Sequence, residues 1–303
     1  MSRDSREPLV SIALPVHNGA DTLGRVIESA LAQTWPDLEL VISDNASTDG
    51  TEDLCRQFER EDGRVVYHRH AANVGLLNNF TGAARIASGT YLRWLGDDDW
   101  LEPDYLARTL EAFAEDEHRV LVTTQIVYTE PDGTQALHTD HVPAPLASLD
   151  PADRFAAMLR LLTSGYAVLD PLYALIRRDL AVLPRRNMLR EDEVYAARLA
   201  LAGPWGHVAA PLARRHRSEI SSPDLVRLLG VPGWHRHAVD VLQCRDLLSW
   251  VARAPLDPGQ RRRARLEVAR LYARRKGNAM LRGAGKLRRA TARAPWLSPE
   301  GAG

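Results

Sequence analysis

Three consecutive carboxylates, Asp97, Asp98 and Asp99, directly follow the apolar segment 90–95. That segment has the length and composition of a buried strand, which places the three acids at its carboxyl end. Adjacent carboxylates repel one another and are costly to gather unless a cation compensates them. A divalent ion that bridges carboxylate and phosphate oxygens would do so, which indicates metal-assisted chemistry on a phosphorylated substrate. The alternative is a solvated acidic turn.

Strand and helix patterns alternate through the first half of the chain. Short apolar segments predict strands, the first of which should end at Pro15 because a proline cannot continue a hydrogen-bonded ladder. Alternation with short connections predicts a mostly parallel sheet covered by helices on both faces. Ligands of such sheets bind beyond the carboxyl ends of the strands, so the loops 15–19, 43–50 and 96–100 should share one rim. We expect strands at 9–14, 38–42, 64–68, 90–95 and 120–124, and helices at 20–33, 51–60, 76–87 and 103–115.

The second half is less regular. Residues 125–150 are rich in proline, aspartate and glycine and predict a loop or hairpin. We expect a helix at 151–162, a strand at 170–177 and a helix at 191–201, with the core ending near Arg217.

Several motifs in this order resemble those of family 2 glycosyltransferases, which are inverting enzymes with the nucleotide-binding GT-A fold. The resemblance covers roughly residues 8–217. Its segments are Val10-Ser-Ile-Ala-Leu-Pro-Val-His-Asn18, Val41-Ile-Ser-Asp44-Asn45-Ala46-Ser47-Thr48-Asp49-Gly50, Ala72-Asn73-Val-Gly75 and Tyr91-Leu-Arg93-Trp-Leu-Gly96-Asp97-Asp98-Asp99-Trp100. It implies a domain at 1–217 with a nucleotide-binding half at about 8–124 and an acceptor-binding half at about 125–217.

The resemblance also implies which residues contact a nucleotide diphosphate sugar. The Asp44 carboxylate could accept hydrogen bonds from a base or a ribose, although the same residues could equally shape a turn and cap a helix. The glycine after Asn73 would allow close approach of the backbone. The predicted donor-binding residues are Pro15, Val16, Asn18, Asp44, Asn45, Ser47, Asn73, Gly75, Arg93 and Asp97.

The acidic segment departs from the family pattern at Gly96, which stands where the first aspartate of an Asp-x-Asp motif is usual. Asp98 then matches the metal-binding aspartate, with Mg²⁺ or Mn²⁺ as the expected ion, and Asp97 would contact the ribose. His216, in the basic segment Arg214-Arg215-His216-Arg217, would be a second metal ligand or a diphosphate contact. The alternative for that segment is a basic surface loop.

The resemblance implies a catalytic base as well. Family members carry an acidic pair before a helix, and Leu189-Arg-Glu191-Asp192-Glu193 matches it with Asp192 as the base. Removing a proton from an attacking hydroxyl is ordinary carboxylate chemistry. The alternative is that these acids cap the helix and favour its dipole.

Charge and composition indicate the binding partners and the cellular compartment to expect. The chain has 39 basic and 39 acidic residues and gives no reason to expect nucleic-acid binding. Two cysteines without metal-site spacing, a polar start and no long apolar run predict a cytoplasmic protein.

The composition of residues 218–303 predicts a basic helical extension with an apolar stripe at Leu266, Ala269 and Tyr272. It would contact anionic lipid at the inner face of the membrane or pack one face on the core.

The sequence therefore predicts metal-dependent, inverting transfer of a sugar from a UDP-, dTDP- or GDP-linked donor to an acceptor hydroxyl. The acceptor would belong to a polysaccharide, a glycolipid or a natural product, and could be linked to a lipid. One rival is a sugar nucleotidyltransferase, although the loop after the first strand lacks that class's basic residues. Another is a silent sugar-nucleotide-binding scaffold, which could dispense with Asp98 and Asp192.

Overall fold

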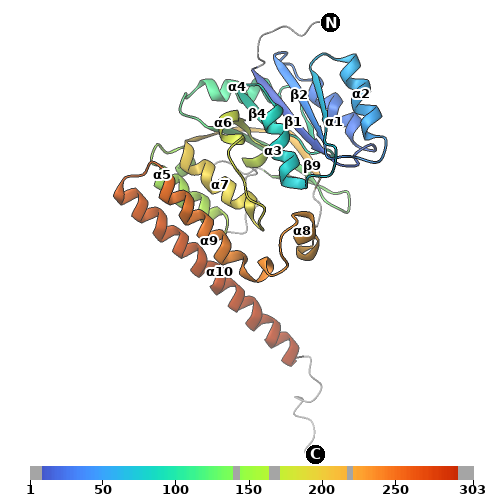
Figure 1. Ribbon diagram of the computed structural model, residues 1–303. Helices are drawn as coiled ribbons and strands as arrows, with labels where there is room; N and C mark the ends of the chain where they lie inside the picture. Colours follow the sequence, from blue (N-terminus) through green and yellow to red (C-terminus); the bar gives the residue numbers. More distant parts are fainter. Residues whose placement is uncertain (1–8, 139–143, 164–170, 217–220, 293–303) are drawn as a thin grey trace, which may run out of the picture.

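One sheet of nine strands runs through the molecule and separates two layers of helices (Figure 1). The computed structural model describes residues 9–138, 144–163, 171–216 and 221–292. The strand order is β3-β2-β1-β4-β8-β6-β9-β5, and β7 pairs with β6 outside this path. The strands are β1 (Val10–Val16), β2 (Leu38–Asp44), β3 (Val65–Arg69), β4 (Tyr91–Trp94), β5 (Trp100–Leu101), β6 (Leu121–Thr129), β7 (Gln135–His138), β8 (Leu175–Arg177) and β9 (Trp205–His216).

The four strands from β3 to β4 form a parallel half-sheet, as the alternating pattern predicts. The expected end of the first strand at Pro15 is wrong, because β1 continues and pairs Pro15 with Ser43 and Val16 with Asp44. Ala13 directs its carbonyl oxygen toward the β4 side, where it accepts the Leu95 N–H. Pro15, two residues on, faces the same side beyond the last β1–β4 pair. Its missing N–H therefore removes no ladder bond.

The other half of the sheet is mixed. β8 lies antiparallel between β4 and β6, and β9 runs parallel to β6 with an irregular register near Thr124 and Gln125. The hairpin β6–β7 occupies part of the predicted loop or hairpin. The expected strand at 170–177 is limited to β8 and preceded by a 3-10 turn, Pro171–Tyr173. Asp170 and Arg217, which bounded two predicted segments, lie outside the described residues.

Helices cover both faces of the sheet, which confirms the predicted fold class. Apolar residues of α1, α2 and α4 pack on one face with Val10, Ile12 and Leu14 of β1. Those of α3, α5, α6 and α7 pack on the other face, where β1 presents the small Ala13. The helices are α1 (Leu23–Leu31), α2 (Thr51–Glu61), α3 (Leu76–Ile86), α4 (Tyr105–Ala114), α5 (Pro151–Leu161), α6 (Arg178–Ala181), α7 (Glu191–Ala202), α8 (Ser222–Leu228), α9 (His235–Arg253) and α10 (Pro258–Ala292).

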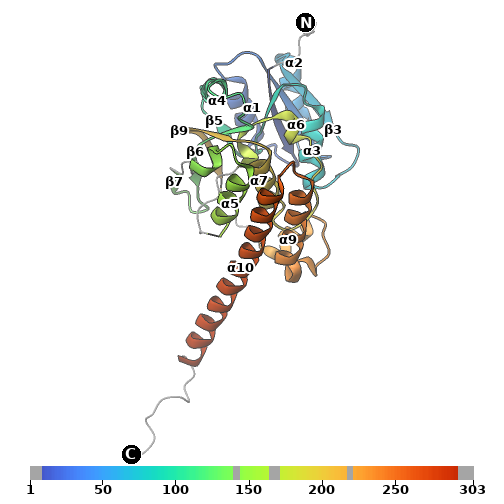
Figure 2. The same ribbon diagram turned by 90° about the vertical axis from the view of Figure 1, so that its left-hand side faces the viewer.

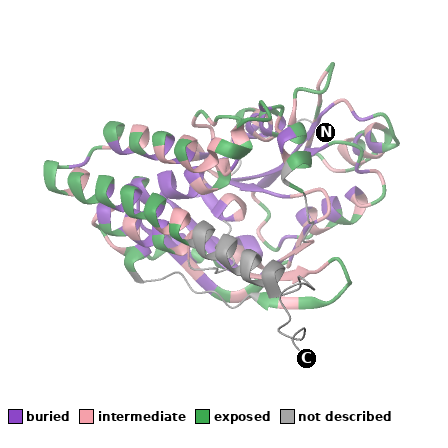
Figure 3. Cartoon of the chain, turned by 90° about the horizontal axis from the view of Figure 1, so that it is seen from below, coloured by how far each residue is buried: buried purple, intermediate pink, exposed green. Residues whose placement is uncertain are grey.

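The long helices α9 and α10 lie side by side against α5 and α7 (Figures 1 and 2). Ala264, Val268 and Leu271 of α10 join the same apolar cluster as α5 and α7. The predicted stripe is not the face that packs on the core, since Leu266 is 48% and Tyr272 38% exposed. Buried positions gather in the strands and on the inner sides of the helices (Figure 3). Within the described ranges, no helix is sufficiently long and apolar to cross a membrane.

Candidate active site

The loops that follow β1 and β2 meet the segment before α3 at one edge of the parallel half-sheet. Asn18 accepts the Thr48 N–H through its side-chain oxygen at 2.8 Å. Asn45 accepts the Val74 N–H at 2.7 Å and donates to the Asn73 side chain at 3.0 Å. These side-chain amides replace backbone ladder bonds where the strands have ended. Three segments distant in sequence are thereby joined into one rim.

Backbone conformation along this rim requires particular residues. Gly75 has φ 86° and ψ 159°, a region that is essentially restricted to glycine, and nothing lies within 4 Å of the place its Cβ would take. The predicted approach of backbone to ligand at Gly75 is therefore sterically open. Asn18, at φ 57°, adopts the left-handed conformation that asparagine tolerates better than most residues.

Asp44 closes β2 but is fully buried. One carboxylate oxygen accepts the Ser47 N–H at 2.8 Å, and the other accepts the Tyr67 hydroxyl at 2.6 Å. Burial, together with the Asp44 carboxylate, raises the pKa of Tyr67, so that this hydroxyl remains a donor. Ser47 in turn accepts the Asn18 N–H at 2.9 Å. Asp44 therefore shapes the loop, and its contact with a nucleotide stays a prediction.

Two residues of β3 at this rim were not predicted from the sequence. Tyr67 is the partner of Asp44, and Arg69 donates to the Ser47 carbonyl at 2.9 Å and lies 3.5 Å from the Asp44 carboxylate. Both stand near the carboxyl end of a strand that neighbours β2. That position was the available signal, since rim residues were expected at the ends of neighbouring strands.

The three predicted acids occupy the loop between β4 and β5 and have different environments. Asp99 is buried and accepts a hydrogen bond from the Arg215 guanidinium at 2.9 Å. This contact holds β9 to the loop. Asp97 lies beside the first loop, because Thr22 donates its hydroxyl to the Asp97 carbonyl at 2.6 Å. Burial and, secondarily, the Asp98 carboxylate raise the pKa of Asp97 to about 6. Negative charge at this loop is thus incompletely compensated by the protein.

His216 lies against the same loop at the end of β9. Its Nδ1 atom is 2.7 Å from the Asp98 carbonyl oxygen, which can only accept, so Nδ1 carries the proton. This leaves Nε2 as the ring atom that could bind a metal, the usual arrangement of a metal-binding histidine. Within the described part of the chain, no three His, Cys, Asp or Glu side chains form a metal-binding group on their own. The contact joins His216 to the backbone of Asp98, and metal binding by the two side chains stays a prediction.

Arg93 lies in the interior, where its charge acts on Asp99 of the acidic loop. Its side chain is fully buried and donates to the Trp94 carbonyl. Its guanidinium carbon lies 5.2 Å from the centre of the Tyr105 ring and 5.4 Å from that of Tyr173. Arg93 therefore lies near the acidic loop from inside the protein, and its contact with a donor stays a prediction. Pro15 and Val16 are also buried, and their backbone, rather than their side chains, borders the rim.

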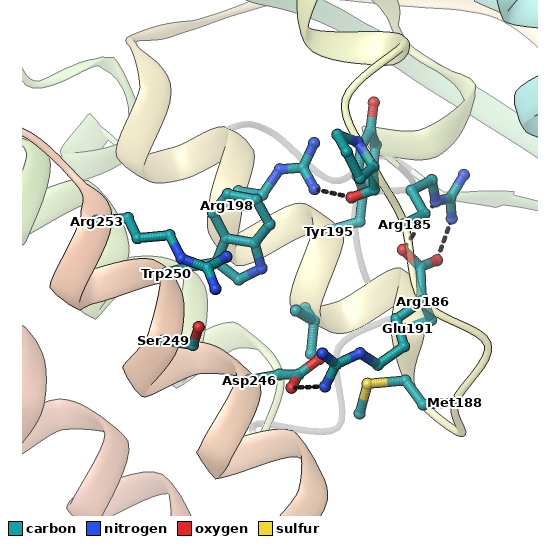
Figure 4. Close-up of a pocket in the computed structure, with 12 residues that line it drawn as sticks. Arg185, Arg186, Met188, Glu191, Tyr195, Arg198, Asp246, Ser249, Trp250 and Arg253 are labelled. Carbon is teal, nitrogen blue, oxygen red and sulfur yellow. Dashed lines mark hydrogen bonds and ion pairs between the residues drawn. The ribbon is translucent and has the colours of Figure 1, made fainter.

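Asp192 is exposed in the first turn of α7. Its neighbours in the acidic motif point elsewhere. Glu191 is held by two nitrogens of Arg185 (Figure 4), and Glu193 accepts from Gln243 at 2.7 Å and from Arg275. Tyr195, one turn on, packs edge-on against Trp94, with ring centres 6.1 Å apart. Because Trp94 ends β4, this contact ties the start of α7 to the strand that leads into the acidic loop.

Comparison with protein-family models matches residues 11–182 to the model of glycosyl transferase family 2. The chain belongs to this family. The match includes the rim loops and the acidic loop and ends before Asp192 and His216. Membership of this family agrees with the confirmed fold and argues against the sugar nucleotidyltransferase alternative.

This chain spans only a small part of several curated relatives in the family. Hyaluronan synthase of Pasteurella multocida is 35% identical over 133 residues, which is 44% of this chain and 14% of the synthase. The chain likewise spans less than a fifth of the chondroitin synthase of the same species and of glycosyltransferase GlyA of Streptococcus pneumoniae. The similarity to these relatives therefore concerns one part of each.

Solved structures share the fold with this family 2 chain at low identity. TarS of S. aureus, solved with UDP-GlcNAc, has a TM-score of 0.61 and 15% identity, covering 87% of this chain and 72% of its own. The mannosyltransferase PcManGT of Pyrobaculum calidifontis, solved with GDP-Man and Mn²⁺, has a TM-score of 0.50 and 17% identity. That match covers 93% of this chain and 81% of PcManGT.

Glu193 offers a test of how α7 is attached to the C-terminal helices of this family 2 chain. Burial is the main reason why its pKa rises from 4.5 to about 7. Between those values the folded state binds more protons than the unfolded state, so the Glu193 contribution to stability falls as pH rises. We expect the stability of Glu193→Gln relative to the parent to increase from pH 5 to pH 8. Urea unfolding of both proteins at the two pH values measures this, and a difference independent of pH would contradict it.

Proposed function

We propose that the chain is a glycosyltransferase that moves a sugar from a nucleoside diphosphate sugar to an acceptor hydroxyl with inversion at the anomeric carbon. The observation that carries the proposal is the junction of β9 with the acidic loop, where His216 donates to the Asp98 carbonyl at 2.7 Å. It unites two predicted metal ligands from segments more than a hundred residues apart. Asp97, the neighbour of Asp98, lies beside the first rim loop because its carbonyl accepts the Thr22 hydroxyl.

Donor binding is assigned to the rim. Asn18, Asn45, Ser47, Asn73 and Gly75 surround it, and Asp44 shapes it from beneath. UDP-GlcNAc on TarS and GDP-Man on PcManGT, two proteins with this fold, support a nucleoside diphosphate sugar as the donor class. The similarity to hyaluronan and chondroitin synthases supports a carbohydrate acceptor in polysaccharide synthesis.

We assign a divalent ion, Mg²⁺ or Mn²⁺, to Asp98 and His216. The uncompensated charge of the acidic loop supports it, as does the Mn²⁺ in PcManGT. When bound, the ion would supply positive charge for the diphosphate leaving group. Asp99, paired with Arg215, fixes the loop on which Asp98 stands.

We assign the role of general base to Asp192. It is exposed in the first turn of α7 and stands where the family carries its catalytic acid. A carboxylate at this position would take the proton of the acceptor hydroxyl as that hydroxyl attacks the sugar. A single displacement from the face opposite the diphosphate inverts the anomeric carbon.

A ligand panel tests the proposal. We expect one nucleotide among UDP, dTDP and GDP, or its sugar conjugate, to raise the melting temperature by several degrees in the presence of Mn²⁺. A ligand at a hundred times its Kd stabilises the folded state by about 2.7 kcal/mol. The matching sugar nucleotide should then be consumed when acceptors are added. Binding without any transfer or donor hydrolysis across a broad panel would favour the scaffold alternative.

Peripheral membrane contact through α10 is a further part of the proposal. Leu266 and Tyr272 are exposed beside the exposed Arg262 and Arg265, which gives α10 a mixed apolar and basic outer surface. We expect the double variant Arg262→Gln, Arg265→Gln to bind anionic vesicles about thirtyfold more weakly in low salt. Each basic group near such a surface contributes about 1 kcal/mol.

Vesicle sedimentation at two salt concentrations measures this, because the difference should shrink as salt rises. A control of equal charge is Arg25→Gln with Arg60→Gln, at exposed positions of α1 and α2. Equal vesicle binding by both double variants would contradict membrane contact through Arg262 and Arg265 and favour a packing role for α10.

A further inference from the structure

A cavity of about 340 Å³ lies between α7, the loop that precedes it and α9 (Figure 4). None of the predicted donor-binding or metal-binding residues lines it. Its walls contain four arginines, Arg185, Arg186, Arg198 and Arg253, but only two acids, Glu191 and Asp246. The lining therefore has an excess of two positive charges.

Both acids of the cavity are already paired. Glu191 is held by Arg185, and Asp246 accepts from Arg186 at 2.7 Å. Arg198 and Arg253 have no acidic partner among the residues that the structure describes. The unmatched charge is thus located on these two side chains.

The inner wall holds hydrogen-bond donors that lack acceptors. Arg198 is only 7% exposed and uses one terminal nitrogen to bond the Pro184 carbonyl at 2.8 Å. Among the described residues, its Nε and other terminal nitrogen have no hydrogen-bond partner, and neither has the second terminal nitrogen of Arg185 or the Tyr195 hydroxyl. Buried donors without acceptors are rare and costly in folded proteins, and a cluster of them indicates a missing acceptor.

One indole ring contacts both unmatched arginines. The guanidinium carbons of Arg198 and Arg253 lie 4.3 Å and 5.4 Å from the centre of the Trp250 ring. Attraction to the ring favours each cation, but two cations on one ring also repel each other. An anion between them would remove that repulsion and supply the absent acceptors.

We propose that this cavity binds a phosphate group, either free inorganic phosphate or a phosphomonoester on a larger ligand. The excess of two charges matches a phosphate dianion, and guanidinium groups present forked donors that fit its oxygens. The site adjoins the first turn of α7 through Glu191, the neighbour of Asp192. It is distinct from the rim, and phosphate binding here does not depend on sugar transfer.

Titration calorimetry on the full chain tests the proposal, with chelator present to suppress metal-dependent binding at the rim. We expect saturable binding of inorganic phosphate and none of acetate at equal ionic strength. Arg253→Gln should weaken phosphate binding at least about tenfold, because a hydrogen bond to a charged group is lost. Arg25→Gln, an exposed arginine of α1 outside the cavity, should bind phosphate as the parent does.

A second variant covers the inner wall. Arg198→Lys keeps the charge but loses the fork and should also weaken binding. Tighter binding of glycerol 1-phosphate than of inorganic phosphate would identify an ester ligand, and the reverse order would identify free phosphate. The proposal is overturned if phosphate does not bind saturably, or if Arg253→Gln and Arg198→Lys both bind it like the parent. Neither outcome affects binding of nucleotide with Mn²⁺, which should be unchanged in Arg253→Gln.

Discussion

Replacing Asp98 by alanine should abolish sugar transfer and the dependence of nucleotide binding on Mg²⁺ or Mn²⁺. The loop holds three adjacent acids, of which Asp99 is neutralised by Arg215 at 2.9 Å. Asp98 stands beside His216, whose Nε2 is the ring atom left to bind an ion. Lewis-acid stabilisation of a leaving phosphate is worth several kcal/mol, so we expect a loss of at least about a thousandfold in rate.

Calorimetry with nucleoside diphosphate, with and without metal, separates binding from turnover in this test. In the parent, chelator should remove most of the affinity, whereas in Asp98→Ala the weak residual affinity should be the same in both conditions. Asp53→Ala, an exposed acid of α2, is the matched control and should behave as the parent. Full transfer by the parent in excess chelator would disprove a metal role for Asp98.

Much of the nucleotide-binding half could be predicted because its local patterns agree with its tertiary environment. β1 and β2 are largely apolar in sequence and buried on both faces. The polar residues Asn18 and Asn45 follow them, just after each strand ends. The end of β1 was misplaced for a reason visible only in three dimensions. Whether a proline interrupts a ladder depends on which neighbour its nitrogen faces, and Pro15 faces the side where β4 has stopped.

The second half was harder to predict because its contacts join distant segments. β9 contains Gly206 and Pro211 and shifts register against β6, so no two-residue alternation marks it as a strand. Arg93 was among the donor-binding residues that the family resemblance implied, yet strand alternation directs it into the interior, toward Tyr105. Arg198 and Arg253 of the cavity carried no sequence signal, since their contact with Trp250 depends on how α9 packs.

Exchanging Asp192 for asparagine should leave donor binding within a few-fold of the parent and reduce sugar transfer at least about a hundredfold. A general base acts on the acceptor, so its loss spares the nucleotide, and such assistance is typically worth about 10² to 10⁴ in rate. The amide has nearly the same shape and remains compatible with the first turn of α7, so folding should change little. Single-turnover rates and nucleotide affinity, measured on the same preparations, test both halves of the expectation.

The matched control is Asp179→Asn, which makes the same exchange at an exposed position in the first turn of α6. It should bind and transfer as the parent does, because α6 contributes nothing to the candidate site. Glu191 is a poor substitute as base, since both of its oxygens are held by Arg185 and its side chain is only 11% exposed. If Asp192→Asn transfers sugar at nearly the parent rate, the acceptor proton must leave by another route. The acidic motif would then serve to fix α7 through Arg185, Gln243 and Arg275.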